Sequence, residues 1–107
     1  MPMPSKILTQ LKILETLYNR GEVNETIEKT LDKILRQELA ISQEKNAELE
    51  KDLQKFEQQY QMPSSEFYQR FHSGELGDEI DWVEWNAFYE MWNRLQEHIK
   101  LLESSDL

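Results

Sequence analysis

Few side chains in this sequence have the type and spacing that catalysis requires. The two histidines, His72 and His98, fall in different predicted helices, and neither has a serine or metal-ligating partner at a spacing typical of an active site. The sequence contains no cysteine, so neither thiolate chemistry nor a disulfide framework is available. We therefore expect a protein that is not an enzyme and that uses no cofactor or metal.

Acidic side chains gather in the stretch between the last two predicted helices and at the start of the final one. They lack the spacing of an EF-hand loop and its glycine at the sharp turn. We therefore interpret the stretch as a solvated loop or as a docking surface for a basic partner. Two of its members, Asp81 and Glu84, have the spacing of a capping box, and Ile80 and Trp85 have that of a hydrophobic staple. The cluster consists of Glu75, Asp78, Glu79, Asp81 and Glu84.

Aromatic residues are concentrated in the same part of the chain. Most lie at helical spacing and are expected to form the core, namely Phe67, Phe71, Trp85, Phe88 and Trp92. Trp82 and Tyr89 fall beside that stripe, and large aromatics next to acidic groups are typical of protein-binding hot spots. The predicted partner-binding residues are therefore Glu75, Asp78, Glu79, Trp82 and Tyr89.

The charge balance narrows the kinds of partner. A net charge of −9 disfavours sequence-independent binding to nucleic acid or to anionic membranes. Residues 1–20 are mildly basic, with Lys6, Lys12 and Arg20 against Glu15 alone, so any DNA contact is expected at those three side chains. Residues 62–107 carry three basic and ten acidic side chains. With no apolar run long enough to span a bilayer, we expect a cytoplasmic protein.

The elements that position these residues are predicted to be helices. Helical spacing of apolar residues predicts a short helix over residues 6–19, ended by Gly21, with a short strand over residues 6–14 as the alternative. Asn24 is placed to cap a second helix that continues unbroken to about Tyr60. Pro63 separates it from two further helices, which are expected to fold back as a hairpin. The predicted fold is all-α, a single domain over residues 1–107 with parts 1–22, 23–61 and 62–107.

The long helix carries a heptad pattern of the kind that coiled coils use. Its core positions are Leu35, Leu39, Ser42, Asn46, Leu49, Leu53, Phe56 and Tyr60. In a parallel pair, Asn46 would fix register and oligomeric state. We therefore predict a homodimer whose seam includes Leu35, Leu39, Asn46, Leu49, Leu53 and Phe56. The alternative is that this seam packs against the chain's own later helices.

Residues 11–39, LKILETLYNRGEVNETIEKTLDKILRQEL, resemble the two helices of ribbon-helix-helix repressors. The resemblance implies a phosphate contact at Val23, Asn24 and Glu25. That family reads the DNA major groove with a short strand, and the corresponding start of this chain, MPMPSKI, holds two prolines and one basic residue. Proline removes a donor from a strand.

Residues 62–92 resemble a second group, in the stretch QMPSSEFYQRFHSGELGDEIDWVEW. It comprises small bacterial and archaeal proteins, common in cyanobacteria, some of which look like the antitoxins of toxin–antitoxin pairs. The resemblance implies a homodimeric protein-binding module that neutralises a small basic partner through its acidic, aromatic C-terminal half. The alternative from another class is a structural or adaptor coiled-coil protein without a toxin or DNA partner.

Overall fold

The computed structural model describes residues 5–104, and this part of the chain is all-α, as predicted. Four helices follow one another: α1 (Ser5–Asn19), α2 (Glu25–Tyr60), α3 (Ser64–His72) and α4 (Ile80–Glu103). The described residues contain no strand, so the strand alternative for residues 6–14 is wrong; the two prolines of residues 1–4 lie outside the described part. None of the helices in the described part is long and apolar enough to cross a membrane.

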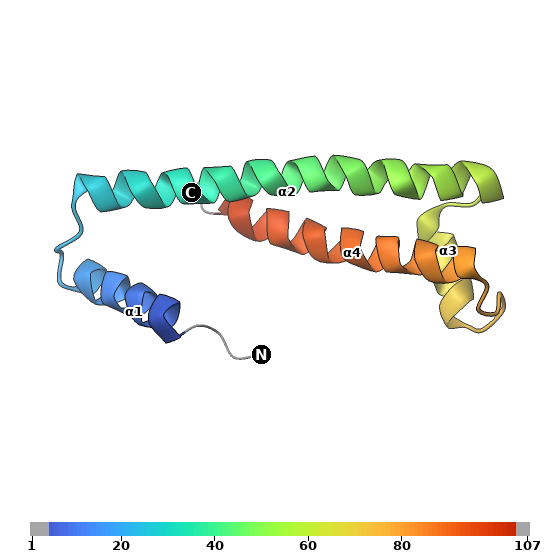
Figure 1. The fold of residues 1–107 in the computed structure, drawn as a ribbon, viewed down its shortest axis with the longest axis horizontal. Helices are drawn as coiled ribbons and strands as arrows, with labels where there is room; N and C mark the ends of the chain where they lie inside the picture. Colours follow the sequence, from blue (N-terminus) through green and yellow to red (C-terminus); the bar gives the residue numbers. More distant parts are fainter. Residues whose placement is uncertain (1–4, 105–107) are drawn as a thin grey trace. The chain divides into compact units, whose positions relative to one another are not determined.

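The chain divides into two compact units, Met1–Ile34 and Leu35–Leu107, and α2 contributes residues to both. The first unit contains α1 and the start of α2 (Figure 1). Gly21, at a φ of 71°, adopts the left-handed conformation that favours glycine, and the Glu22 N–H donates to the Leu17 carbonyl over 2.8 Å. The Asn24 side chain accepts a hydrogen bond from the Ile27 N–H at 3.0 Å. Both predicted helix ends are therefore confirmed.

In the second unit, α4 runs back antiparallel beside the later part of α2, and α3 lies at the turn between them (Figure 1). The predicted C-terminal helical hairpin is thus present. α2 ends just before Pro63, which has no N–H to donate to a continuing helix. α3 ends at His72, and Gly74 just beyond its C-cap has a φ of 85°, where the Glu75 N–H closes the turn on the Arg70 carbonyl at 3.2 Å.

The core of the second unit lies where these three helices meet. The buried apolar side chains of this cluster are Leu53, Phe67 and Trp85, and Leu49 and Leu102 are buried elsewhere along α2 and α4. The predicted core residues of α4, Trp85, Phe88 and Trp92, are buried or half-buried, and the same stripe continues through Leu95 and Ile99 to Leu102. Burial of these large side chains removes apolar surface from water and holds α4 against α2.

The predicted start of the last helix is wrong in detail. α4 begins at Ile80, its N-cap is Glu79, and no side chain caps it. Asp81 therefore lies inside the first turn, where its carboxylate accepts a hydrogen bond from the Tyr60 hydroxyl. Ile80 is 81% exposed, so the proposed staple with Trp85 does not form either. Tyr60 of α2 thus determines the hydrogen bonding of Asp81. The sequence around Asp81 does not indicate that Tyr60 lies next to it.

Candidate protein-binding site

A stack of aromatic rings fixes α3 and α4 against the end of α2. Phe67 and Trp85 are both fully buried, and their rings stack in parallel with centroids 4.0 Å apart. Phe56 of α2 stacks on Trp85 at 5.4 Å. The indole N–H of Trp85 donates to the buried hydroxyl of Ser64 at 2.9 Å, so the polar atom of this tryptophan is satisfied.

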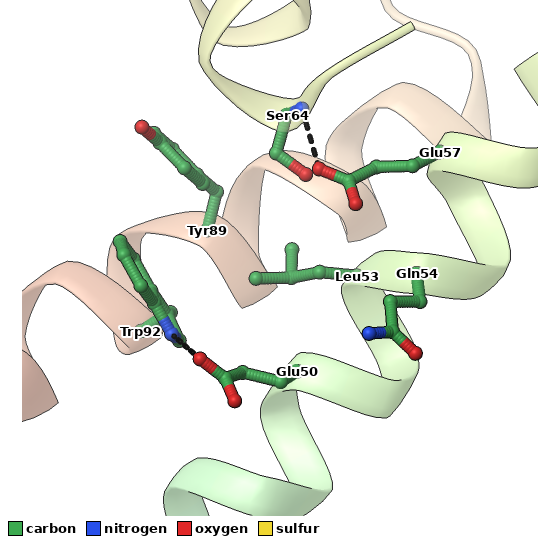
Figure 2. Close-up of a pocket in the computed structure, with 7 residues that line it drawn as sticks. All are labelled: Glu50, Leu53, Gln54, Glu57, Ser64, Tyr89 and Trp92. Atoms are coloured by element: carbon green, nitrogen blue, oxygen red, sulfur yellow. Dashed lines mark hydrogen bonds between the residues drawn. The ribbon is translucent and has the colours of Figure 1, made fainter. Parts of the chain in front are cut away.

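Beside the stack, a pocket of about 250 Å³ opens between α2 and α4. Carboxylate and amide side chains of α2 form one side and two aromatic rings of α4 form the other, as Figure 2 shows. The lining residues are Glu50, Leu53, Gln54, Glu57, Ser64, Tyr89 and Trp92. None of them is basic, so the lining itself offers no positive charge to the two carboxylates.

Hydrogen bonds hold both carboxylates of the pocket in place. Glu57 accepts from the backbone N–H of Ser64 at 2.8 Å, which satisfies one of the free N–H groups at the start of α3 (Figure 2). Glu50 accepts from the indole N–H of Trp92 at 3.3 Å (Figure 2). Each carboxylate keeps further acceptor positions for a bound group.

The aromatic side of the pocket is equally well supported. Tyr89 stacks on Trp92 with ring centroids 5.9 Å apart and packs on Tyr68 at 5.1 Å. Both Tyr89 and Trp92 are half-buried. Aromatic faces attract cations, and ionised carboxylates form strong hydrogen bonds with ammonium and guanidinium groups. The arrangement therefore suits the side chain of a lysine or an arginine.

The structure places the predicted partner-binding residues in different surroundings. Glu75, Asp78 and Glu79 are exposed in the loop between α3 and α4. Trp82, which falls beside the buried stripe in the sequence, is half-buried and packs on Tyr60 with ring centroids 4.6 Å apart. Tyr89, by contrast, lines the pocket.

The sequence analysis did not predict the two carboxylates of the pocket, although a signal for them was present. Glu50 and Glu57 are seven residues apart and each directly follows an apolar heptad residue, Leu49 and Phe56. This spacing puts two carboxylates on one face of a helix. It did not indicate that Tyr89 and Trp92 lie opposite them, because that depends on how α4 packs.

Most of the predicted dimer seam is covered by the chain's own α4. Leu49 and Leu53 are buried, and Phe56 stacks on Trp85. Asn46 accepts a hydrogen bond from the side chain of Gln96. Near the start of the seam, Leu39 is half-buried and Leu35 is 39% exposed. From Asn46 onward the structure thus follows the alternative in which the seam packs within the chain.

The three basic residues considered for DNA binding are all exposed in the first unit. Lys6 and Lys12 both lie on α1, and their separation of six residues places them about 120° apart around the helix axis. Arg20 lies in the turn that follows α1. The three side chains therefore do not form a single basic face on α1.

The histidines make surface contacts to polar side chains. The ring of His72 is 3.0 Å from the Asn86 side-chain oxygen, and the ring of His98 is 3.5 Å from the Glu38 carboxylate. Among residues 5–104, no group of three or more histidine, aspartate or glutamate side chains is placed to hold a metal ion.

A scan against protein-family models finds none that matches this chain, and searches among curated proteins and solved structures find no significant match.

Proposed function

We propose that this chain is a homodimeric, antitoxin-like protein-binding module that acts in the cytoplasm. It neutralises a small basic partner protein by covering it with its acidic, aromatic C-terminal half. The observation that carries this proposal is the pocket in which Glu50 and Glu57 face Tyr89 and Trp92 without any basic residue in the lining. A lysine or arginine of the partner would enter it.

A cation in this pocket gains two kinds of interaction at once. The rings of Tyr89 and Trp92 offer cation–π attraction, on the order of 0.5–2 kcal/mol depending on how far the site is desolvated. The carboxylates of Glu50 and Glu57 offer charge-assisted hydrogen bonds, which are about twice as strong as neutral ones. Because existing hydrogen bonds orient both carboxylates, little side-chain entropy remains to be lost when the partner binds.

The distribution of charge supports a basic partner. Residues 1–34 carry five basic and five acidic side chains, so residues 35–107 carry seven basic and sixteen acidic ones and hold the entire net charge of −9. Such an excess attracts a basic protein over a distance and speeds its association. The exposed carboxylates of Glu75, Asp78 and Glu79 belong to this part of the chain.

The alternative function is that of a structural or adaptor coiled-coil protein. The 36-residue length of α2 favours it, because a helix that long offers an extended surface for other helices. The two functions differ in what they require of a partner. A basic, RNA-cleaving toxin is expected only for the antitoxin-like protein, and its gene would be adjacent to the gene of this chain.

The function is tested by expressing the product of the adjacent gene and titrating it into this chain. All three tryptophans, Trp82, Trp85 and Trp92, lie in the second unit, so tryptophan fluorescence reports binding there. We expect a basic product that binds this chain in a saturable manner, with an affinity that falls as salt is added. An acidic product, or a basic one that gives no change in fluorescence and does not co-purify, would contradict the antitoxin-like function.

The pocket is tested separately by nuclear magnetic resonance, with arginine methyl ester as the probe. The Trp92 indole N–H donates to a pocket carboxylate, whereas that of Trp85 donates to buried Ser64. The Trp92 indole resonance should therefore shift on titration while the Trp85 resonance stays in place. Equal shifts, or none at millimolar probe, would show that the pocket does not select cations.

A further inference from the structure

A second hollow adjoins the pocket that we propose to bind a cation, here called the cation pocket. Its volume is about 570 Å³, and it shares two lining residues, Gln54 and Glu57, with the cation pocket. Figure 2 shows Gln54 on α2 between Glu50 and Glu57. The two hollows therefore follow one another along α2 towards its end. We call the second hollow the glutamine groove, and its lining residues are Gln54, Glu57, Gln58, Gln61, Met62 and Pro63.

Side-chain amides make up half of the lining of the glutamine groove. Gln54 and Gln58 are exposed and about one helical turn apart, and within residues 5–104 neither amide has a hydrogen-bond partner. The Gln61 amide donates to the backbone carbonyl of Gln58 at 2.6 Å and keeps its own carbonyl oxygen as an acceptor. The groove therefore offers hydrogen-bond donors and acceptors together, with Glu57 as the one charged residue of its lining.

Groups of this kind complement the backbone of another polypeptide. Each peptide group has one N–H donor and one C=O acceptor, and a glutamine amide can pair with either. In a helix these backbone groups are already bonded to one another, whereas an extended segment outside a sheet leaves them free. The glutamine groove therefore suits an extended segment better than a helix.

We propose that the basic partner binds through an extended segment, whose cationic side chain enters the cation pocket while the adjoining backbone lies in the glutamine groove. The proposal rests on the proposed function and specifies which kind of partner segment the site takes. Glu57 borders both hollows, so a cation beside it leaves the neighbouring peptide groups within the reach of Gln54 and Gln58. The carboxylates then select for charge, and the glutamines tolerate different side chains beside the cation.

The test compares two probes of equal charge by nuclear magnetic resonance, N-acetyl-arginine N-methylamide and the peptide acetyl-Ala-Ala-Arg-Ala-Ala-amide. The Trp92 indole resonance reports entry of the cation for both probes, because its N–H donates to Glu50. The peptide adds only uncharged flanking residues and their peptide groups. We expect the peptide to bind at least about fivefold more tightly, since net gains of this order accompany one or two added hydrogen bonds.

Gln58→Ala tests the groove within the full chain, and Gln43→Ala is the matched control. Both replace an exposed glutamine of α2, but Gln58 lines the glutamine groove and Gln43 lies outside both hollows. Alanine favours the helix and keeps the backbone carbonyl to which Gln61 donates, so both variants should fold. In Gln58→Ala the peptide should lose most of its advantage, while the arginine derivative binds as before. Gln43→Ala should change neither affinity.

The conformation of the bound peptide is measured on the unaltered chain by transferred nuclear Overhauser effects. An extended segment gives strong contacts between the Hα of one residue and the amide hydrogen of the next. Strong contacts between successive amide hydrogens would show a bound helix and would overturn the proposal.

The outcomes separate the glutamine groove from the proposed function. Equal affinities of the two probes, or an advantage that survives in Gln58→Ala, would overturn the groove and leave the cation pocket intact. If neither probe shifts the Trp92 resonance, the pocket and the groove both fail. The fluorescence titration with the adjacent gene's product decides partner binding independently.

Discussion

Replacing Ser64 by alanine tests whether the aromatic stack is held as described. The Ser64 hydroxyl is buried and accepts the hydrogen bond of the Trp85 indole N–H at 2.9 Å. Trp85 is itself fully buried, so no water is available to replace the lost acceptor. The backbone N–H of Ser64 would still donate to Glu57, because alanine keeps it. The substitution therefore isolates one hydrogen bond at the centre of the second unit.

The cost follows from the burial of the donor that remains. A buried donor without a partner costs about 1–3 kcal/mol, more than the net value of an average hydrogen bond. A unit of this size has a total free energy of unfolding of about 4–11 kcal/mol. Ser64→Ala should therefore remove a substantial part of it and lower the melting temperature by about 4–8 °C for each kcal/mol.

Urea unfolding followed by tryptophan fluorescence measures this effect, since all three tryptophans lie in the second unit. Ser65→Ala is the matched control: the same substitution in the same helical turn, at an exposed position. Both variants gain the small advantage of alanine in helix propensity, so the difference between them reports the hydrogen bond. Equal midpoints for the two variants would refute the buried Trp85 to Ser64 bond.

Three further predictions concern single residues. The hydrogen bond to Asp81, followed by partial burial and the negative charges of Asp81 and Glu79, raises the pKa of the Tyr60 phenol above its ordinary value. The stability that the protonated Tyr60 hydroxyl contributes is complete below about pH 10 and is lost as the pH rises through the raised pKa. Tyr60→Phe should therefore reduce the loss of melting temperature at alkaline pH in a pH series of thermal melts. Asp81→Ala should destabilise the wild type but have little further effect in the Tyr60→Phe background, because Asp81 acts through Tyr60 and not as a cap; additive losses would restore the capping interpretation. Gly21→Ala should cost about 1–2 kcal/mol, measured by circular dichroism, because φ is positive there and no other atom lies near enough to contribute; an unchanged melt would contradict this.

The sequence was sufficient for the elements whose signals are local. Apolar spacing predicted α1 and α2, Asn24 identified the start of α2, and Gly21 identified the end of α1. Each of these depends on side chains and backbone within about one helical turn. The helical spacing of Trp85, Phe88 and Trp92 likewise predicted which side of α4 is buried.

The sequence was insufficient where two helices determine a residue's role together. Asp81 has the spacing of a cap, yet Tyr60 of α2 takes its carboxylate. Trp82 falls at the margin of the α4 stripe, yet Tyr60 and Phe67 cover part of its ring. The heptad of α2 is equally compatible with a second copy and with α4, because both present an apolar helical stripe. Only the fold shows which surface covers it.

The most direct test of the central claim is the affinity of the adjacent gene's product for two variants that lose the same charge. Glu50→Gln removes a carboxylate from the pocket and can still accept from Trp92, whereas Glu44→Gln removes one from an exposed position of α2 outside it. If the pocket holds a cationic side chain, Glu50→Gln weakens binding at least about tenfold, or 1.4 kcal/mol, and Glu44→Gln changes it little. Equal affinities for the two variants would contradict the claim.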